Sequence, residues 1–315
     1  MNFDLFNYPV KKEILPLRIP YMGSKNKIAE TLLLKMLEIK PNAKYFYDLF
    51  GGGASLTLTA LQYGLKTYYN EKQKGMVDLL KYLINPTLAG KYGLFPDDFY
   101  NFITREEFFE LIKQDTLKSQ FARICYSFGN MQTSYAFGKD KEELKHLGHN
   151  IVIFQDKDAL KELNQKTNSN FILSNKKTWN ERRLDLQKEI SCKLYFERIQ
   201  ELQRLQQLEQ LERLHQLQQL PAFTITNLDF REVKIETPID ETIVYLDPPY
   251  RGTATYIEKC FFEDIDKYFR NSPHSCFMSE YDAPFKSVFE IDKKCTLSAT
   301  NNSLVKKEKL FYNNC

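Results

Sequence analysis

The residues best suited to chemistry are Asp247, Pro248, Pro249 and Tyr250, which follow the apolar run ETIVYL. Prolines carry a carbonyl acceptor but no N–H donor, and an ionised aspartate also only accepts hydrogen bonds. A planar amino group has two N–H donors that need two such acceptors, and the heterocycle that carries it can stack on the tyrosine ring. The segment therefore predicts a site for an aromatic amine, although consecutive prolines are also common in loops without a catalytic role.

A second segment, DLFGGG, begins at Asp48 and places Phe50, Gly51 and Gly53 where an expected strand meets an expected helix. Glycines allow a ligand to approach the backbone closely because no Cβ intervenes. The segment is not a phosphate-binding loop, since no Gly-Lys-Ser/Thr follows, and Leu56 stands where a dinucleotide fingerprint has its third glycine. It suits a ligand with an amino-acid tail and no pyrophosphate. A tight strand-to-helix turn without a ligand is the alternative.

Glu71 follows the next expected strand, KTYYN. A carboxylate at the end of that strand, after a glycine turn, can accept both hydroxyls of a ribose. We therefore expect Glu71 to bind an adenosine-containing cofactor; a solvated strand-end glutamate is the alternative.

These residues depend on a strand–helix–strand–helix pattern over residues 44–84. Its strands are short apolar runs, and its helices show apolar residues at helical spacing. Further strands are expected at 241–246 and 275–281, with a helix at 261–271 between them. The alternation predicts an α/β fold in which a parallel sheet carries helices on its faces.

Residues 126–180 are polar and irregular, and a stretch of this length inside an α/β domain suggests an inserted module. Within it, Asn130 and Gln132 can read adenine edges, Ser134 offers a hydroxyl, and Lys139 can reach guanine or phosphate. A polar surface loop without a nucleic-acid partner is the alternative.

The expected organisation is an α/β domain at 1–90 and 221–315, an inserted, mainly helical region at 91–180, and a long helix at 181–220. Leucine recurs every three residues from Leu202 to Leu220. Such leucines spiral around a helix and therefore fit a coiled coil poorly. A partly solvated helix, a self-association surface and a DNA-facing arm stay open.

Composition sets broader limits. The 315 residues are 43% hydrophobic and 27% charged with a net charge of +3, so affinity for nucleic acid must come from local basic clusters. No apolar run approaches the roughly 20 residues of a membrane span, and no secretory leader is visible, so we expect a cytoplasmic protein. Six scattered cysteines and four histidines predict no metal site, and His146 and His149 are expected at the surface.

The motifs, taken together and in order, resemble the Dam-type family of adenine-specific DNA methyltransferases, which transfer a methyl group from S-adenosyl-L-methionine. The matching segments are YMGSK at 21–25, DLFGGGAS at 48–55, NE at 70–71, the insertion at 126–180, and DPPY at 247–250. The resemblance implies a class I methyltransferase fold with a Rossmann-like, doubly wound mixed sheet and an inserted target-recognition module.

The resemblance also implies roles for individual residues. The expected cofactor contacts are Tyr21, Lys25, Asp48, Phe50, Gly51, Gly53, Glu71, Asp229 and Asp247. The expected contacts with the target base come from Asp247 through Tyr250, where Asp247 and the Pro248 carbonyl would accept the hydrogens of the amine. The expected phosphate contacts are Lys306 and Lys307 near the C-terminus.

The implied activity is methylation of the N6 amine of an adenine flipped out of double-stranded DNA. Methylation of an amino group on cytosine or RNA, and an inert DNA-binding paralogue, stay open as alternatives. A cognate restriction endonuclease is a possible partner, and a monomer is favoured. The sequence does not reveal the recognised DNA site.

Overall fold

The structure is a computed structural model, and it describes residues 19, 25–85, 89–127, 132–136, 138, 142–193, 208, 211, 223–251, 259–295 and 304–314. The chain divides into two compact units. The first, called the sheet unit below, comprises Met1–Ile19, Gly23–Val77 and Gln219–Cys315. The second, called the helical unit, comprises Pro20–Met22 and Asp78–Gln218. Tyr21, Asn130 and Lys139, which the sequence singles out, lie outside the described residues.

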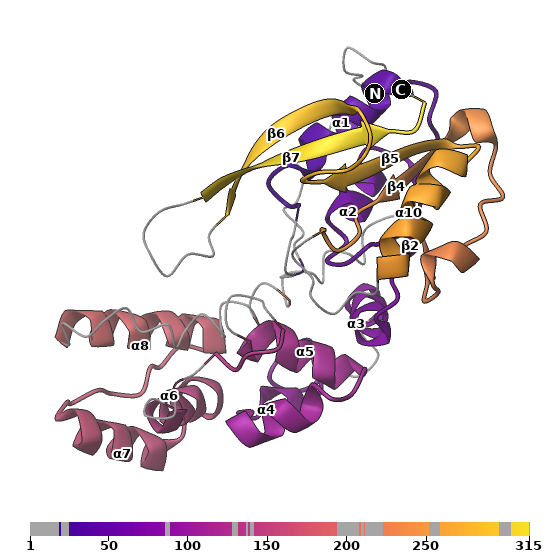
Figure 1. Cartoon of the computed structure of the whole chain (residues 1–315). Coiled ribbons are helices and arrows are strands. Elements are labelled where there is room, and N and C mark those ends of the chain that lie inside the picture. The colour runs from indigo at the N-terminus through magenta and orange to yellow at the C-terminus, as the bar shows by residue number, and fades with distance from the viewer. Residues whose placement is uncertain are drawn as a thin grey trace. The chain divides into compact units, whose positions relative to one another are not determined.

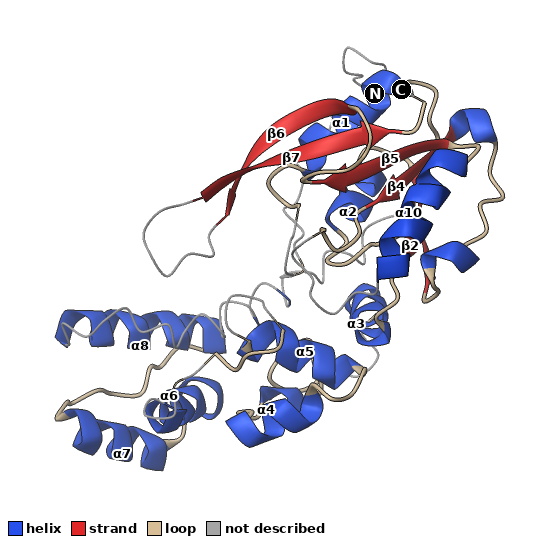
Figure 2. Cartoon of the chain, viewed as in Figure 1, coloured by secondary structure: helices blue, strands red, loops and turns tan. Residues whose placement is uncertain are grey.

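The sheet unit contains a seven-stranded sheet in the order β3-β2-β1-β4-β5-β7-β6 (Figures 1 and 2). The strands β3, β2, β1, β4 and β5 run parallel, and β7 pairs antiparallel with both β5 and β6. This mixed, Rossmann-like order confirms the predicted fold class. The strands are β1 Tyr45–Asp48, β2 Lys66–Asn70, β3 Thr224–Thr226, β4 Thr242–Leu246, β5 Ser275–Glu280, β6 Ser287–Cys295 and β7 Leu304–Tyr312.

Helices cover both faces of the sheet (Figure 1). One apolar cluster joins α1 (Ala29–Ile39) and α2 (Ser55–Gln62) to strand residues such as Ile243 and Phe277. The other joins α10 (Lys259–Asn271) to the residues that alternate with them, such as Val244 and Met278. Every residue of β4 and of β5 is buried, and each strand has an unbroken apolar run, 243–246 and 276–278, in place of an alternating pattern.

The helical unit consists, in its described part, of helices and irregular chain joined by one isolated β-bridge between Ser127 and Tyr135. Its core is rich in aromatic rings; Phe95, Phe99 and Phe121 contact one another at centroid distances of 5.0–5.6 Å. The helices are α4 Arg105–Leu111, α5 Leu117–Tyr126, α6 Glu142–Phe154, α7 Lys157–Thr167 and α8 Trp179–Lys193, and α3 (Lys74–Ile84) crosses the boundary between the units.

Two expectations for the helical unit were wrong. Residues 142–167, expected to be irregular, form α6 and α7, because Leu147 and Ile151 provide a short buried face that polar neighbours obscure in the sequence. His149, expected at the surface, is buried, and its ring nitrogen lies 2.6 Å from the carbonyl oxygen of Tyr100. A histidine is readily buried when a backbone group satisfies its ring nitrogen.

The leucine-rich segment is described at two positions only. Leu208 and Leu211 are helical and fully buried, so at these positions the leucines pack inside the protein.

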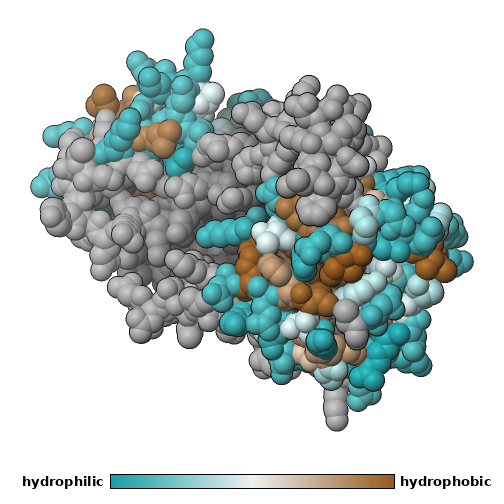
Figure 3. Space-filling view, turned by 90° about the horizontal axis from the view of Figure 1, so that it is seen from above, coloured by the Kyte–Doolittle hydropathy of each residue, from teal (hydrophilic) through white to brown (hydrophobic). Residues whose placement is uncertain are grey.

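Hydrophilic side chains cover much of the coloured surface on the face drawn in Figure 3, with apolar side chains gathered in patches between them. Among the described residues, each helix is too short or too polar to cross a lipid bilayer.

Candidate active site

The sheet topology brings the glycine turn, Glu71 and the segment that begins at Asp247 to one edge of the sheet. Asp48 ends β1, Asn70 ends β2 directly before Glu71, and Asp247 follows the last residue of β4. The strands β1, β2 and β4 are parallel neighbours, so their carboxyl ends lie together. Open α/β sheets bind ligands in the crevice outside these ends, where the strand order changes direction. In this sheet that point lies between β1 and β4.

The glycine turn after β1 is packed against β2. The Gly51 N–H donates to the Asn70 carbonyl at 2.8 Å, and the Tyr69 hydroxyl donates to the Gly52 carbonyl at 2.8 Å. A Cβ added to Gly51 would lie 2.1 Å from the Tyr69 ring. Gly51 is therefore required for internal packing, beyond any role in ligand approach.

The carboxylate of Glu71 ties the glycine turn to the residues that lead into α3. It accepts from the Gly52 N–H at 2.9 Å and from the Gln73 N–H at 2.8 Å. The side chain is half-buried. This places a fixed carboxylate at the end of β2, where the sequence predicts a ribose contact.

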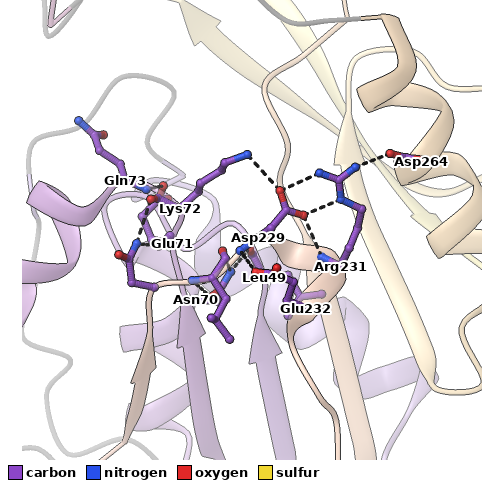
Figure 4. A network of polar contacts seen from close by, with 11 residues as sticks. Leu49, Asn70, Glu71, Lys72, Gln73, Asp229, Arg231, Glu232 and Asp264 are labelled. Atoms are coloured by element: carbon purple, nitrogen blue, oxygen red, sulfur yellow. Dashed lines mark hydrogen bonds and ion pairs between the residues drawn. The ribbon is translucent and has the colours of Figure 1, made fainter. Parts of the chain in front are cut away.

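Asp229 belongs to the same polar network as Glu71 and is joined to it through Lys72, the residue that follows Glu71 (Figure 4). Its carboxylate accepts two hydrogen bonds from the Arg231 guanidinium, at 2.7 and 2.9 Å, one from the Arg231 N–H at 3.2 Å, and one from Lys72 at 3.0 Å. Hydrogen bonds from Arg231 are the main reason why the pKa of Asp229 lies well below its usual range. Asn70 links this segment to β1, since its amide donates to the carbonyls of Leu49 and Leu228 at 3.1 Å each.

Phe50 supplies an aromatic wall at the same edge. Its ring lies 5.1 Å from that of Phe230 and 6.2 Å from that of Phe261, centroid to centroid. Phe50 is half-buried, so part of its surface stays accessible next to the glycine turn.

Lys25, Asp247, Tyr250 and Glu308 form a buried polar cluster. The Lys25 ammonium donates to both Asp247 oxygens, at 2.6 and 2.8 Å, and to the Tyr250 hydroxyl. The Tyr250 hydroxyl donates in turn to Glu308, whose Oε1 lies 3.4 Å from Lys25 Nζ. The Lys25 and Glu308 side chains are 5% and 0% exposed, whereas that of Asp247 is 21% exposed. Asp247 is therefore the more exposed of the two carboxylates in the cluster.

The charges of this cluster shift the pKa values of its members. Burial by itself lowers the pKa of Lys25, but the adjacent Asp247 and Glu308 carboxylates outweigh it and the net direction is upward. Burial, reinforced by the same two carboxylates, raises the pKa of Tyr250 well above 10.0. Lysine is therefore the cation, and tyrosine stays a neutral hydrogen-bond donor.

Asp48 and Glu280 are two further carboxyl groups at this edge. Burial raises the pKa of Asp48 to about 7, with Asp247 and Glu71 adding to the shift and a 2.7 Å hydrogen bond from Thr57 opposing it. Burial likewise raises the pKa of Glu280, the last residue of β5, to about 7. The carboxylates collected here suit a cationic ligand.

The structure brings together most of the residues expected to bind cofactor or base: Lys25, Asp48, Phe50, Gly51, Gly53, Glu71, Asp229, Asp247, Pro248, Pro249 and Tyr250 all belong to the sheet unit. Gln132 and Ser134 lie in the helical unit, between α5 and α6. Lys307 lies on β7 and pairs with Glu290 at 3.2 Å; its neighbour Lys306 is in register with Lys293 of β6.

Sequence reasoning missed Glu280 and Glu308. Glu280 ends an apolar strand at the same edge as Asp48, so the rule that selected Asp48 could have found it. Glu308 lies on the same face of β7 as the buried Leu310. A glutamate at such an inward position of a strand is the sequence signal that could have identified it as a site residue.

The fold and the edge site together define a Rossmann-like α/β enzyme. The model of the D12 class N6 adenine-specific DNA methyltransferase family matches residues 21–312. The chain belongs to this family, which confirms the resemblance seen in its motifs. No curated protein matches the chain.

The residues present fit the methyl donor that the family implies. Its positively charged sulfonium and ammonium groups suit the carboxylates of Asp48, Glu71 and Asp247, and its adenine suits an aromatic wall such as Phe50. One oxygen of the buried Asp48 carboxyl, Oδ1, has no hydrogen-bond partner among the described residues, which leaves it able to accept from a ligand.

Proposed function

We propose that the chain transfers a methyl group from S-adenosyl-L-methionine to the N6 amine of an adenine rotated out of double-stranded DNA. The observation that carries the proposal is that Asp247 and the buried Pro248 follow β4, the parallel neighbour of the strand β1 that leads into the glycine turn. Family membership supports the adenine and the DNA, and the donor and the rotation of the base are part of the proposal.

For the cofactor, Glu71 would hold the ribose hydroxyls, and Phe50 would contact the adenine. The glycine turn and Asp48 would lie against the amino-acid tail, with Tyr21 and Lys25 as the further contacts that the family resemblance implies. When bound, S-adenosyl-L-methionine supplies an electrophilic methyl group on a sulfonium. The role of Asp229 near the adenine is part of the same proposal, and its pairing with Arg231 fixes the position of the carboxylate.

For the target base, the protein's contribution is positioning and electrostatics. The exocyclic nitrogen is a poor nucleophile because its lone pair is delocalised into the purine. If Asp247 and the Pro248 carbonyl each accept one hydrogen, the nitrogen becomes tetrahedral and its lone pair is directed out of the ring plane. Tyr250 offers a ring face for stacking, worth about 1–3 kcal/mol, which offsets part of the cost of unstacking the base.

For the DNA, we propose that Asn130, Gln132, Ser134 and Lys139 read bases, and that Lys306 and Lys307 contact phosphates. Ser134 is exposed and the Lys307 side chain is 64% exposed, which supports these roles. The same proposal assigns catalysis to 1–90 and 221–315, recognition to 91–180, and a long helix to 181–220. It includes a monomer that acts in the cytoplasm, with a cognate restriction endonuclease as a further partner.

Replacement of Asp247 tests the proposal. Asp247→Ala removes one of the two acceptors, so methyl transfer to DNA should fall by at least about 100-fold, while cofactor retention in equilibrium dialysis stays within a few-fold of wild type. Product is measured by digesting DNA to nucleosides and identifying the methylated one by mass spectrometry.

The matched control is Asp240→Ala, an exposed residue just before β4 and therefore at the opposite end of that strand. Normal adenine methylation by Asp247→Ala would refute the assigned role. A methylated cytosine in place of N6-methyladenine would redirect the proposal to another amine.

A further inference from the structure

We propose that Glu308 is a positioning residue, which keeps Lys25 paired and Tyr250 oriented when the target amine takes over the oxygens of Asp247. The proposal rests on the proposed function and adds to it a residue on the closing strand β7. In this proposal Glu308 does not contact the target base and acts on it by way of Lys25 and Tyr250.

The position of Glu308 is unusual for a carboxylate. It lies two residues before Leu310 on the same face of β7, and Leu310 belongs to the apolar cluster under α1 and α2. The Lys25 carbonyl accepts the first hydrogen bonds of the turn that leads into α1, from the N–H groups of Ile28 and Ala29. Glu308 and Lys25 thus approach one another over the same face of the sheet. A fully buried carboxylate is costly unless a cation and hydrogen-bond donors compensate it.

Glu308 contacts two other members of the cluster. It lies 3.4 Å from the Lys25 ammonium, and it accepts a hydrogen bond from the Tyr250 hydroxyl, which itself accepts from Lys25. The ammonium has three donors; two are directed to Asp247 and one to Tyr250. Glu308 is therefore the second counter-ion of Lys25, at a longer distance than Asp247.

The arrangement has a consequence for the reaction. Asp247 is the carboxylate that is open to the site, and in the structure both of its oxygens are engaged by Lys25. When the target amine donates to Asp247, the ammonium must give up part of that contact while it stays buried. Glu308 provides the compensating charge, and a small movement of Nζ toward it shortens the 3.4 Å contact between them. No proton is transferred and no covalent bond forms or breaks in this step.

Tyr250 is held by the same residue. Its hydroxyl bonds to Glu308, and the ring of Tyr281 contacts it edge-on at a centroid distance of 4.4 Å. These two contacts fix the plane of the ring on which the proposed base would stack.

The test replaces Glu308 by glutamine, which has nearly the same shape and can still accept from Tyr250 but carries no charge. We expect kcat to fall about 10- to 100-fold, with cofactor affinity changed less than about threefold. The alkaline limb of the pH profile of kcat/KM should move to lower pH, because Lys25 loses one of the two carboxylates that raise its pKa. Among the described residues, the other titratable groups that face Lys25 include Asp247 and Tyr250, with Asp48, Tyr245 and Glu280 close to Asp247.

A double-mutant cycle separates this role from a structural one. If Glu308 acts through Lys25, then Glu308→Gln should have a much smaller effect in a Lys25→Met background than in wild type. Glu38→Gln, an exposed residue on α1 paired with Lys35, is the matched control and should leave kcat and the pH profile unchanged. Additive losses in the cycle, or a wild-type kcat and pH profile in Glu308→Gln, would overturn the proposal.

A measurement that does not depend on catalysis distinguishes failure of the proposed function from failure of the Glu308–Lys25 pairing. The ¹³C NMR titration of the Lys25 side chain, assigned by its loss in Lys25→Met, should show deprotonation at lower pH in Glu308→Gln than in wild type. If the wild-type chain methylates no adenine but this shift is seen, the proposed function fails while the pairing of Glu308 with Lys25 stands. An unchanged titration in a folded Glu308→Gln protein would overturn the pairing itself.

Discussion

At the scale of single residues, Lys25 is the cation that compensates the carboxylates of Asp247 and Glu308. Its ammonium is almost fully buried and contacts two carboxylates and a phenol hydroxyl. A buried ion pair adds little compared with an apolar pair of the same shape, but loss of one partner leaves the other charge uncompensated. The cluster therefore depends strongly on each of its members.

Lys25→Met should lower the free energy of unfolding by about 3 kcal/mol, because Asp247 and Glu308 would remain buried without their cation. Urea denaturation at pH 7 measures the change. Lys35→Met, at an exposed ion pair on α1, is the control and should cost less than about 1 kcal/mol. Equal losses in the two variants would show that the Lys25 cluster carries no special stabilisation.

Asp48 makes stability depend on pH in the opposite sense from an ordinary ion-paired acid. Its pKa is about 7 in the folded protein against 3.8 for the ordinary group, so the folded state binds more protons than the unfolded state between these values. Stability must then fall as pH rises from about 4 to 7. The carboxyl is most destabilising above pH 7, where it is charged in both states.

Asp48→Asn should therefore become progressively more stable than wild type from pH 4 to 7, with a plateau above about pH 7 and a difference of at most about 4 kcal/mol. Thermal or urea unfolding of both proteins across this range measures it. Asp240→Asn, at an exposed position, should follow the wild-type profile. A difference that does not change with pH would contradict the burial-driven shift.

At the scale of elements, the turn between β1 and α2 is fixed by its contact with β2. The space beside Gly51 is filled by the Tyr69 ring, whose hydroxyl also bonds to Gly52. The geometry of the turn is thus set by packing between adjacent strands as much as by the glycines themselves.

Gly51→Ala should destabilise the protein by about 1–3 kcal/mol, because its Cβ would overlap the Tyr69 ring. The matched control is Gly148→Ala in α6, where a Cβ meets nothing within 4 Å; it should stabilise by about 0.5–1 kcal/mol, since alanine favours a helix interior. Unfolding free energies of both variants decide the matter, and the prediction fails if both change in the same direction.

At the scale of the whole molecule, the helical unit interrupts the sheet unit at a place that can tolerate it. The chain leaves β2 through α3, forms the helical unit, and returns as β3, which pairs parallel with β2 at the edge of the sheet. Parallel neighbours always need a long crossover connection, so a large insertion there leaves the strand order intact. The match of one family model across 21–312 includes both units.

The sequence by itself determined the α/β class, the order of the motifs and the edge where they meet. These features follow from short-range patterns: apolar runs that end in glycines or acids, and parallel strands whose carboxyl ends must lie together. Asp48, Glu71 and Asp247 could be placed at that edge because each directly follows or ends a strand.

Only the tertiary structure decided which charges are buried together. In the sequence, KKEKLF is a run of charges typical of a solvated strand, and Lys25 belongs to a turn near the other end of the chain. Insertion of β7 between β5 and β6 carries Glu308 under α1, where it meets Lys25 and Tyr250. Burial and pairing of this kind depend on contacts between residues far apart in sequence, which no local periodicity encodes.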